Sequence, residues 1–232
     1  MNYFITIMIG ILLCGGGMLE ASVADKMPQP TPQAAQPDAA PLLVNLSYVY
    51  RANGQGEFLP IKEGSVLHSG DHYKLILTAS EECHIYIFQV DSANKIFQLF
   101  PMGSFGGVTL NNFNPVKQGE TVYIPAESKS FELDAQTGAE KIYFLASRAR
   151  NEELETAYQQ LAEKQERNSL QEQLAAIDQL LKYAEALQQS AETAERPESV
   201  TWEENGQQFS AFLQRLENVR DGVSYVLTFE HR

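Results

Sequence analysis

The stretch from His84 to Pro101 constrains the fold of this chain most strongly. It reads as two apolar, aromatic-rich segments, HIYIFQV and IFQLF, on either side of the four-residue turn Ser92–Lys95. A loop rich in glycine and asparagine then leads to a third apolar segment, residues 121–124. Two such segments joined by a tight turn are the pattern of a β-hairpin, and the sequence therefore predicts a β-rich core.

Apolar and polar residues alternate along several other segments. The alternation begins at Leu42, and it predicts further strands at 42–50, 73–79, 131–133 and 141–146. The segment 85–90 is instead apolar on both faces, which predicts a central strand that is covered on each side. The expected fold is mainly β: an antiparallel β-sandwich, immunoglobulin-like in general architecture, formed by residues 42–150 and 222–232.

A helical insertion is expected between these two parts, at residues 151–221. Apolar residues recur there at helical spacing in two narrow stripes: Leu154, Tyr158 and Leu161, and then Leu170, Leu174, Ile177 and Leu181. A capping box at Ser169 and Glu172 separates the stripes. A helical hairpin and one long helix with a phase slip both satisfy this pattern.

A further helix is predicted after Pro197, because Thr201 and Glu204 have the spacing of a second capping box. Its apolar face, Phe209, Phe212, Leu213 and Leu216, is expected to pack on the sandwich. Asp221 and Gly222 are expected to end this helix. Alternation from Val223 to Phe229 predicts that the last strand joins the sandwich.

The N-terminal region has the pattern of an export signal. An apolar run is followed by Ser22-Val23-Ala24, whose small residues suit signal-peptidase cleavage, so residues 1–24 are predicted to be a signal peptide. Cys14 leaves lipid attachment open as an alternative, although the bulky Leu13 precedes it. Residues 25–41 are rich in Pro, Gln and Ala and predict an extended linker.

Composition narrows the range of partners. The formal net charge is −13, so the phosphate backbone of a nucleic acid would be repelled, and no nucleic-acid partner is expected. The N-terminal apolar run is shorter than the roughly 20 residues that cross a bilayer, so no stable membrane insertion is expected after cleavage.

Candidate residues for chemistry are few. His68, Asp71 and His72 could begin a metal site, but turn formation at Gly70-Asp71 explains the same residues. Cys83 is expected to be a small core residue. Oxygen-bearing side chains could bind calcium, although turn propensity accounts for them and the EF-hand spacing is absent: Asp91, Asn94, Asn111, Asn112, Asn114 and Asp134. No cofactor, catalytic residue or metal ligand is therefore assigned.

Two segments are candidate binding surfaces for an unidentified protein partner. The loop 102–119 is long enough to be functional, and it carries Phe105 and Phe113. The alternative is that these rings only attach the loop to the sandwich. The stripe Leu170, Leu174, Ile177 and Leu181 could pair with a partner helix or pack within its own chain.

Several pieces of sequence resemble a known family. They are SGDHYKLIL, CHIYIFQVDS, LFP, NPVKQGE, YIP and GAEKIYFLASR, which fall within residues 66–148. Their order and spacing resemble the domain-of-unknown-function family numbered 4384. The resemblance implies a β-rich accessory module of bacteria, extracytoplasmic or fused to signalling and peptidase-like domains, and it supplies no catalytic residues.

The sequence therefore predicts an exported, non-catalytic interaction or accessory module of the bacterial cell envelope. One alternative is a metal-dependent or hydrolase-like enzyme that uses the region around His68 and His72. The other is a structural envelope protein that is lipid-anchored at Cys14.

Export has a direct test. Cleavage after Ala24 should give a mature chain that begins at Asp25. Intact-mass measurement of protein purified from the extracytoplasmic fraction should show this chain. An uncleaved N-terminus, or an acyl group on Cys14, would contradict the prediction.

Overall fold

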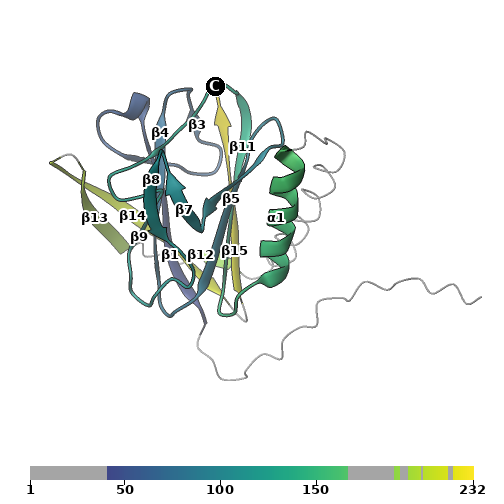
Figure 1. The fold of residues 1–232 in the computed structure, drawn as a ribbon. Helices are drawn as coiled ribbons and strands as arrows, with labels where there is room; N and C mark the ends of the chain where they lie inside the picture. The colour runs from purple at the N-terminus through teal and green to yellow at the C-terminus, as the bar shows by residue number, and fades with distance from the viewer. Residues whose placement is uncertain (1–40, 167–190, 194–197, 205, 219–221) are drawn as a thin grey trace, which may run out of the picture. The chain divides into compact units, whose positions relative to one another are not determined.

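The computed structural model describes residues 41–166, 191–193, 198–204, 206–218 and 222–232. Their strands form two main sheets that pack against each other (Figure 1). The expected signal peptide, almost all of the linker, Cys14 and the stripe Leu170, Leu174, Ile177 and Leu181 lie outside the described residues.

The first sheet has the strand order β10-β4-β1-β14-β12. These strands are β10 (Phe131–Glu132), β4 (His72–Ala79), β1 (Leu43–Arg51), β14 (Gln207–Asn218) and β12 (Ala191–Thr193). Three more strands attach to them: β2 (Leu59–Pro60) pairs with β1, β9 (Val122–Ile124) with β4, and β13 (Glu198–Glu204) with β14. A short 3-10 helix, η1 (Ala52–Gly54), follows β1.

The second sheet has the order β3-β15-β11-β5-β6. Its strands are β3 (Val66–Leu67), β15 (Gly222–His231), β11 (Gly138–Ser147), β5 (His84–Val90) and β6 (Ile96–Phe100). β15 pairs with β11 from His231 opposite Gly138 to Gly222 opposite Ser147, which confirms that the last strand joins the sandwich. Only the short β3 runs parallel to its neighbour among the pairings described within this sheet.

The main core lies between the two sheets and follows the period of two. Leu75 and Leu77 of β4 face it from one sheet, and Ile85, Ile87 and Phe144 face it from the other. All five side chains are fully buried. Because burial of such a side chain contributes about 1.5–3 kcal/mol, this alternation supplies the main driving force for folding.

The outer face of β5 is covered as well, as its two apolar faces predicted. The helix α1 (Glu152–Glu166) packs there, and Leu154 and Tyr158 contact Tyr86 and Phe88 (Figure 1). The rings of Phe88 and Tyr158 lie 5.2 Å apart. The Asn151 side chain accepts a hydrogen bond from the backbone N–H of Leu154 at 2.9 Å, which caps the start of the helix.

The helix predicted after Pro197 is wrong, because β13 and β14 form an antiparallel hairpin in its place. Phe209, Ala211 and Leu213 are buried at alternate positions and pack with Trp202 against the outer face of the first sheet. Phe212 was expected to face the sandwich, but it is 73% exposed. The capping-box spacing is a local signal, and strand pairing over seven residue pairs overrides it.

The loop 102–119 also differs from the prediction of a long irregular segment. Its first part is a hairpin of β7 (Met102–Phe105) and β8 (Val108–Asn112). Gly106 and Gly107 adopt positive φ angles of 56° and 77°, and their lack of a Cβ permits this tight turn.

Phe209 and Phe212 provide a matched pair on one strand. Phe209→Ala should lower the free energy of unfolding by about 3–5 kcal/mol, because it opens a cavity between Phe58 and Trp202. Phe212→Ala should change it by less than about 0.5 kcal/mol, because that ring faces solvent. Urea denaturation of both variants measures the difference. Equal losses of stability would contradict the strand assignment.

Candidate functional site

At one end of the main core, four strands carry polar side chains at inward-facing positions. They are Tyr73 on β4, Gln89 on β5, Glu140 on β11 and His231 on β15. Each is in phase with apolar core residues of its own strand; Glu140, for example, alternates with Ile142 and Phe144. All four are buried, with exposed fractions between 2% and 8%.

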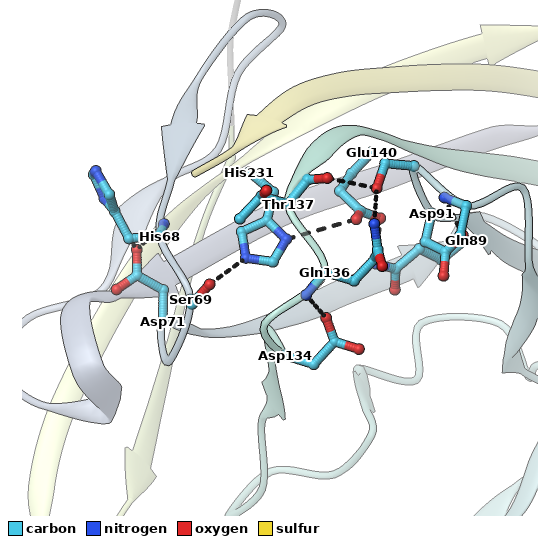
Figure 2. Close-up of polar contacts among 12 residues, drawn as sticks. His68, Ser69, Asp71, Gln89, Asp91, Asp134, Gln136, Thr137, Glu140 and His231 are labelled. Atoms are coloured by element: carbon cyan, nitrogen blue, oxygen red, sulfur yellow. Dashed lines mark hydrogen bonds and ion pairs between the residues drawn. The ribbon is translucent and has the colours of Figure 1, made fainter.

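These side chains form a continuous chain of polar contacts. The Tyr73 hydroxyl donates to Oε1 of Gln89, and the Gln89 amide donates to Oε2 of Glu140 at 3.0 Å. Figure 2 shows the imidazole of His231 between the Glu140 carboxylate and the Ser69 hydroxyl. Its Nδ1 is 3.7 Å from Oε1 of Glu140, and its Nε2 is 3.1 Å from Oγ of Ser69.

Burial dominates the electrostatics of Glu140. Removal of the carboxylate from water raises its pKa, and the negative charge of Asp91 acts in the same direction. The hydrogen bond from Gln89 and the proximity of His231 lower the pKa again, but only in part. Burial, with the charge of Glu140, also raises the pKa of Tyr73. The sandwich therefore holds a carboxyl group whose ionisation costs more than it would in solvent.

The contacts place a hydroxyl, an imidazole and a carboxylate in sequence, as in a catalytic serine triad: Ser69, His231 and Glu140. Their distances do not match those of a triad. The 3.7 Å between His231 and Glu140 is longer than a hydrogen bond. The backbone amides of Ser69, Gly70 and Asp71 each donate to a carbonyl, at 3.0, 2.8 and 2.9 Å. These amides are therefore engaged and do not form an oxyanion hole beside the hydroxyl.

Residues 68–72, which were considered as the start of a metal site, make contacts that support turns and strands. The Asp71 carboxylate accepts hydrogen bonds from the backbone N–H groups of Asn53, at 3.1 Å, and His68, at 2.8 Å. It thereby connects two turns. The His72 ring lies 3.7 Å from the Glu132 carboxylate. Within the part of the chain that the structure describes, no group of three or more His, Cys, Asp or Glu residues has an arrangement that could hold a metal ion.

Four of the six asparagine and aspartate residues considered for calcium bind backbone groups through their side chains: Asp91, Asn112, Asn114 and Asp134. Asp91 accepts from the amides of Ala93, at 2.9 Å, and Lys95, at 2.8 Å, and so closes the hairpin turn. Asn114 exchanges two hydrogen bonds of 2.8 Å with the backbone of Ile85. These contacts agree with the turn propensity of both residue types.

A partly open cavity of about 520 Å³ lies directly beside the polar chain, because Tyr73, Gln89 and Glu140 line it. The lining as a whole is mainly aromatic and acidic, with a few apolar and amide side chains. The aromatic residues are Tyr73, Phe97, Phe105, Phe131 and Tyr158, and the acidic residues are Asp91, Glu132, Asp134 and Glu140. The volume and the mixture of apolar walls with few polar groups are typical of a ligand-binding cavity.

The structure separates the two aromatic residues proposed for binding. Phe105 lines the 520 Å³ cavity, where its ring packs edge-on against Phe131 at 5.1 Å. It is therefore partly buried as a wall of the cavity. Phe113 is 55% exposed and lines two other cavities, of about 490 and 440 Å³. Phe105 and Phe113 do not belong to one common cavity.

Cys83 is a core residue, as predicted. It is fully buried and pairs with Val116 through an isolated β-bridge. Burial is the main reason that the pKa of its thiol is raised to about 12. The thiolate that nucleophilic chemistry requires is therefore disfavoured at neutral pH.

A second group of buried charges lies on the outer face of the first sheet. Glu204 of β13 contacts Nζ of Lys74 and a guanidinium nitrogen of Arg51, each at 2.5 Å. Lys74 also donates to the backbone carbonyl of Glu127 at 2.6 Å. The rings of Phe58 and Trp202 lie 5.1 and 5.6 Å from the ammonium group. Burial lowers the pKa of Lys74, and contact with Glu204 opposes this effect.

Sequence reasoning missed Gln89, Glu140 and His231. A usable signal existed for the first two. Gln89 has the phase of inward-facing apolar neighbours within the predicted strand 85–90, and Glu140 has that phase one position before the predicted strand 141–146. A polar residue at such a position has to find a partner inside the protein. The pairing of His231 with Ser69, across 162 positions of sequence, had no local signal.

Fold and site together define an antiparallel β-sandwich domain with an acidic and aromatic cavity at the polar end of its core. Residues 66–150 match the family model described as Domain of unknown function (DUF4384). The match confirms the resemblance and runs from β3 to just beyond β11, while β1, β14 and β15 complete the two sheets from outside it. No curated protein and no solved structure gives a significant match to the chain. In the described ranges, no helix combines the length and apolarity needed to cross a membrane.

Replacement of Glu140 by Gln should reveal the cost of the buried carboxylate. Because its pKa is raised, the unfolded chain loses this proton at a lower pH than the folded chain does. Wild-type protein therefore loses stability as the pH rises from about 4.3, the ordinary glutamate value, to the raised value. Glu140→Gln avoids this loss while it can still accept the hydrogen bond from Gln89.

Thermal denaturation of both proteins between acidic and slightly alkaline pH measures the effect. The variant should gain stability relative to wild type as the pH rises. Glu203→Gln, at an exposed position of β13, controls for the loss of one negative charge. A wild-type advantage that grows with pH would show that the ionised carboxylate stabilises the fold.

Proposed function

We propose that this chain is an exported, non-catalytic binding module of the bacterial cell envelope, and that it recognises a protein partner. The observation that carries the proposal is the partly open cavity at the polar end of the sandwich. It combines aromatic walls with fixed acidic groups, and these are the features that give a binding site affinity and orientation.

Contacts around the cavity favour binding over catalysis. Gln89, Glu140 and Tyr73 bind one another, so their orientations are set before a ligand arrives. The hydroxyl and imidazole that could supply a nucleophile and a base, Ser69 and His231, do not line the cavity. A preformed polar wall that lacks this hydroxyl and imidazole suits recognition.

Phe97 supports a macromolecular partner. It is 45% exposed and lies on β6, the edge strand of the second sheet, where it also lines the cavity. An exposed aromatic ring beside a cavity is a common anchor in protein interfaces. The stripe Leu170, Leu174, Ile177 and Leu181 stays a second predicted contact, through coiled-coil pairing with a partner helix.

The envelope location is supported by the sequence. The N-terminal apolar run with Ser22-Val23-Ala24 favours export, and the following linker would hold the domain away from the membrane. The resemblance to a family of bacterial extracytoplasmic domains favours the same location.

Site-specific photo-crosslinking tests the proposal. A photoreactive phenylalanine analogue at Phe97 should crosslink to one partner in envelope preparations of the producing cells. The same analogue at Phe212, which is 73% exposed on the first sheet, is the matched control and should give no such product. The absence of a crosslink at Phe97, or the same product at both positions, would overturn a partner site at this cavity.

A further inference from the structure

The cavity beside Glu140 has a strongly biased charge. Four carboxylate residues line it, and among the described residues that do so there is no lysine or arginine. The acids come from separate parts of the fold: Asp91 follows β5, Glu132 belongs to β10, Asp134 follows β10, and Glu140 belongs to β11. The tertiary structure therefore gathers negative charge at this cavity, which would attract a cation.

The aromatic walls provide a second reason for a cationic ligand. Five rings line the cavity, and two pairs of them are in direct contact: Tyr73 with Phe131 at 5.2 Å, and Phe105 with Phe131 at 5.1 Å. The negative face of an aromatic ring attracts an ammonium or guanidinium group, and the ring also packs against alkyl carbons. A ligand that carries a positive charge on an apolar stem matches both properties.

Glu140 shows where the charge would be placed. The residue is 2% exposed, yet it lines the cavity. Oε2 accepts a hydrogen bond from Gln89, and Oε1 lies 3.7 Å from Nδ1 of His231, which is beyond hydrogen-bond distance but within ion-pair range. A cation in the cavity beside this carboxyl group would offset the cost of ionising it in a buried position.

The surroundings of the cavity indicate how such a group would be presented. Phe97 forms an exposed apolar shoulder of the cavity on the edge strand β6. A free amine would bind the acidic residues and leave most of this shoulder without a contact. An extended polypeptide could lie against the shoulder and insert one long side chain.

We propose that the cavity receives the side chain of a lysine or arginine from a basic segment of the partner polypeptide. The charged end lies at Glu140, and the alkyl stem packs against the rings of Phe105 and Phe131. This inference rests on the proposed function and adds to it the chemical class of the ligand and the residues that select it.

Isothermal titration calorimetry of the mature chain with short synthetic peptides tests the inference. The peptides share one extended, uncharged sequence and differ at a central lysine, arginine, norleucine or glutamate. The lysine and arginine peptides should bind, and the norleucine peptide should bind about tenfold more weakly, because it keeps the alkyl stem and lacks the charge. The glutamate peptide should not bind. Butylammonium should bind more weakly than the lysine peptide, because it lacks the main chain that would lie along Phe97.

Variants of the protein assign the site. Glu140→Gln and Asp134→Asn should each weaken binding of the lysine peptide by about tenfold, while Glu203→Gln, an exposed carboxylate on β13, should leave it unchanged. Glu140→Gln should be at least as stable as wild type at neutral pH, so a loss of binding would not reflect unfolding. Phe212→Ala is a further control, because this ring is exposed on the other sheet.

Each contrary result has a distinct meaning. Equal binding of the lysine and norleucine peptides, or unchanged binding by Glu140→Gln, would overturn recognition of a cation at this site. Equal binding of butylammonium and the lysine peptide would overturn the polypeptide source and leave a small amine as the ligand. If no peptide binds while Phe97 still crosslinks to a partner, the inference fails and the proposed function stands.

Discussion

The buried contact of Glu204 with Lys74 and Arg51 is the interaction on which the first sheet depends. The Lys74 ammonium is fully buried among aromatic rings, and without a counter-charge it would be an uncompensated charge in an apolar environment. Glu204 supplies the counter-charge from β13, across 130 positions of sequence. Loss of one partner of such a contact costs about 3–5 kcal/mol in other proteins. The contact therefore holds the β13–β14 hairpin over β1 and β4.

Both sheets satisfy the same requirement, that an apolar outer face must be covered, but they do so by different means. The hairpin covers the first sheet with Trp202 and Phe209, and α1 covers the second sheet with Leu154 and Tyr158. Packed side chains therefore cover the outer faces of both sheets. The polar chain from Tyr73 to Ser69 then terminates the core, and the cavity opens beside it. Glu140 in that chain has a raised pKa, so its ionisation works against the stability of the fold, a cost that proteins often retain where they bind ligands.

Much of the fold was predictable, because strands with one buried face have a period of two that local sequence displays. The hairpin at Ser92–Lys95, the covered strand 85–90 and the closing strand after Gly222 follow from that period alone. Residues 198–218 were predicted to be helical, because Phe209, Phe212, Leu213 and Leu216 also fit a period of 3.6. Local spacing cannot distinguish these two readings. Pairing of β14 with β13 and β1 decides between them, and it leaves Phe212 in solvent.

For the site, the sequence by itself determined which residues are available, four acids and five aromatic residues, in a chain of net charge −13. The period of two also puts Gln89 in phase with Ile87, and Glu140 in phase with Ile142, although neither was recognised from the sequence as part of a site. Only the tertiary structure decided that these residues share one cavity, since they come from β4, β5, β6, β7, β10, β11 and α1, and the segments that follow them. The physical reason is that strand alternation sets the face on which a side chain lies, whereas pairing across long sequence separations sets its neighbours.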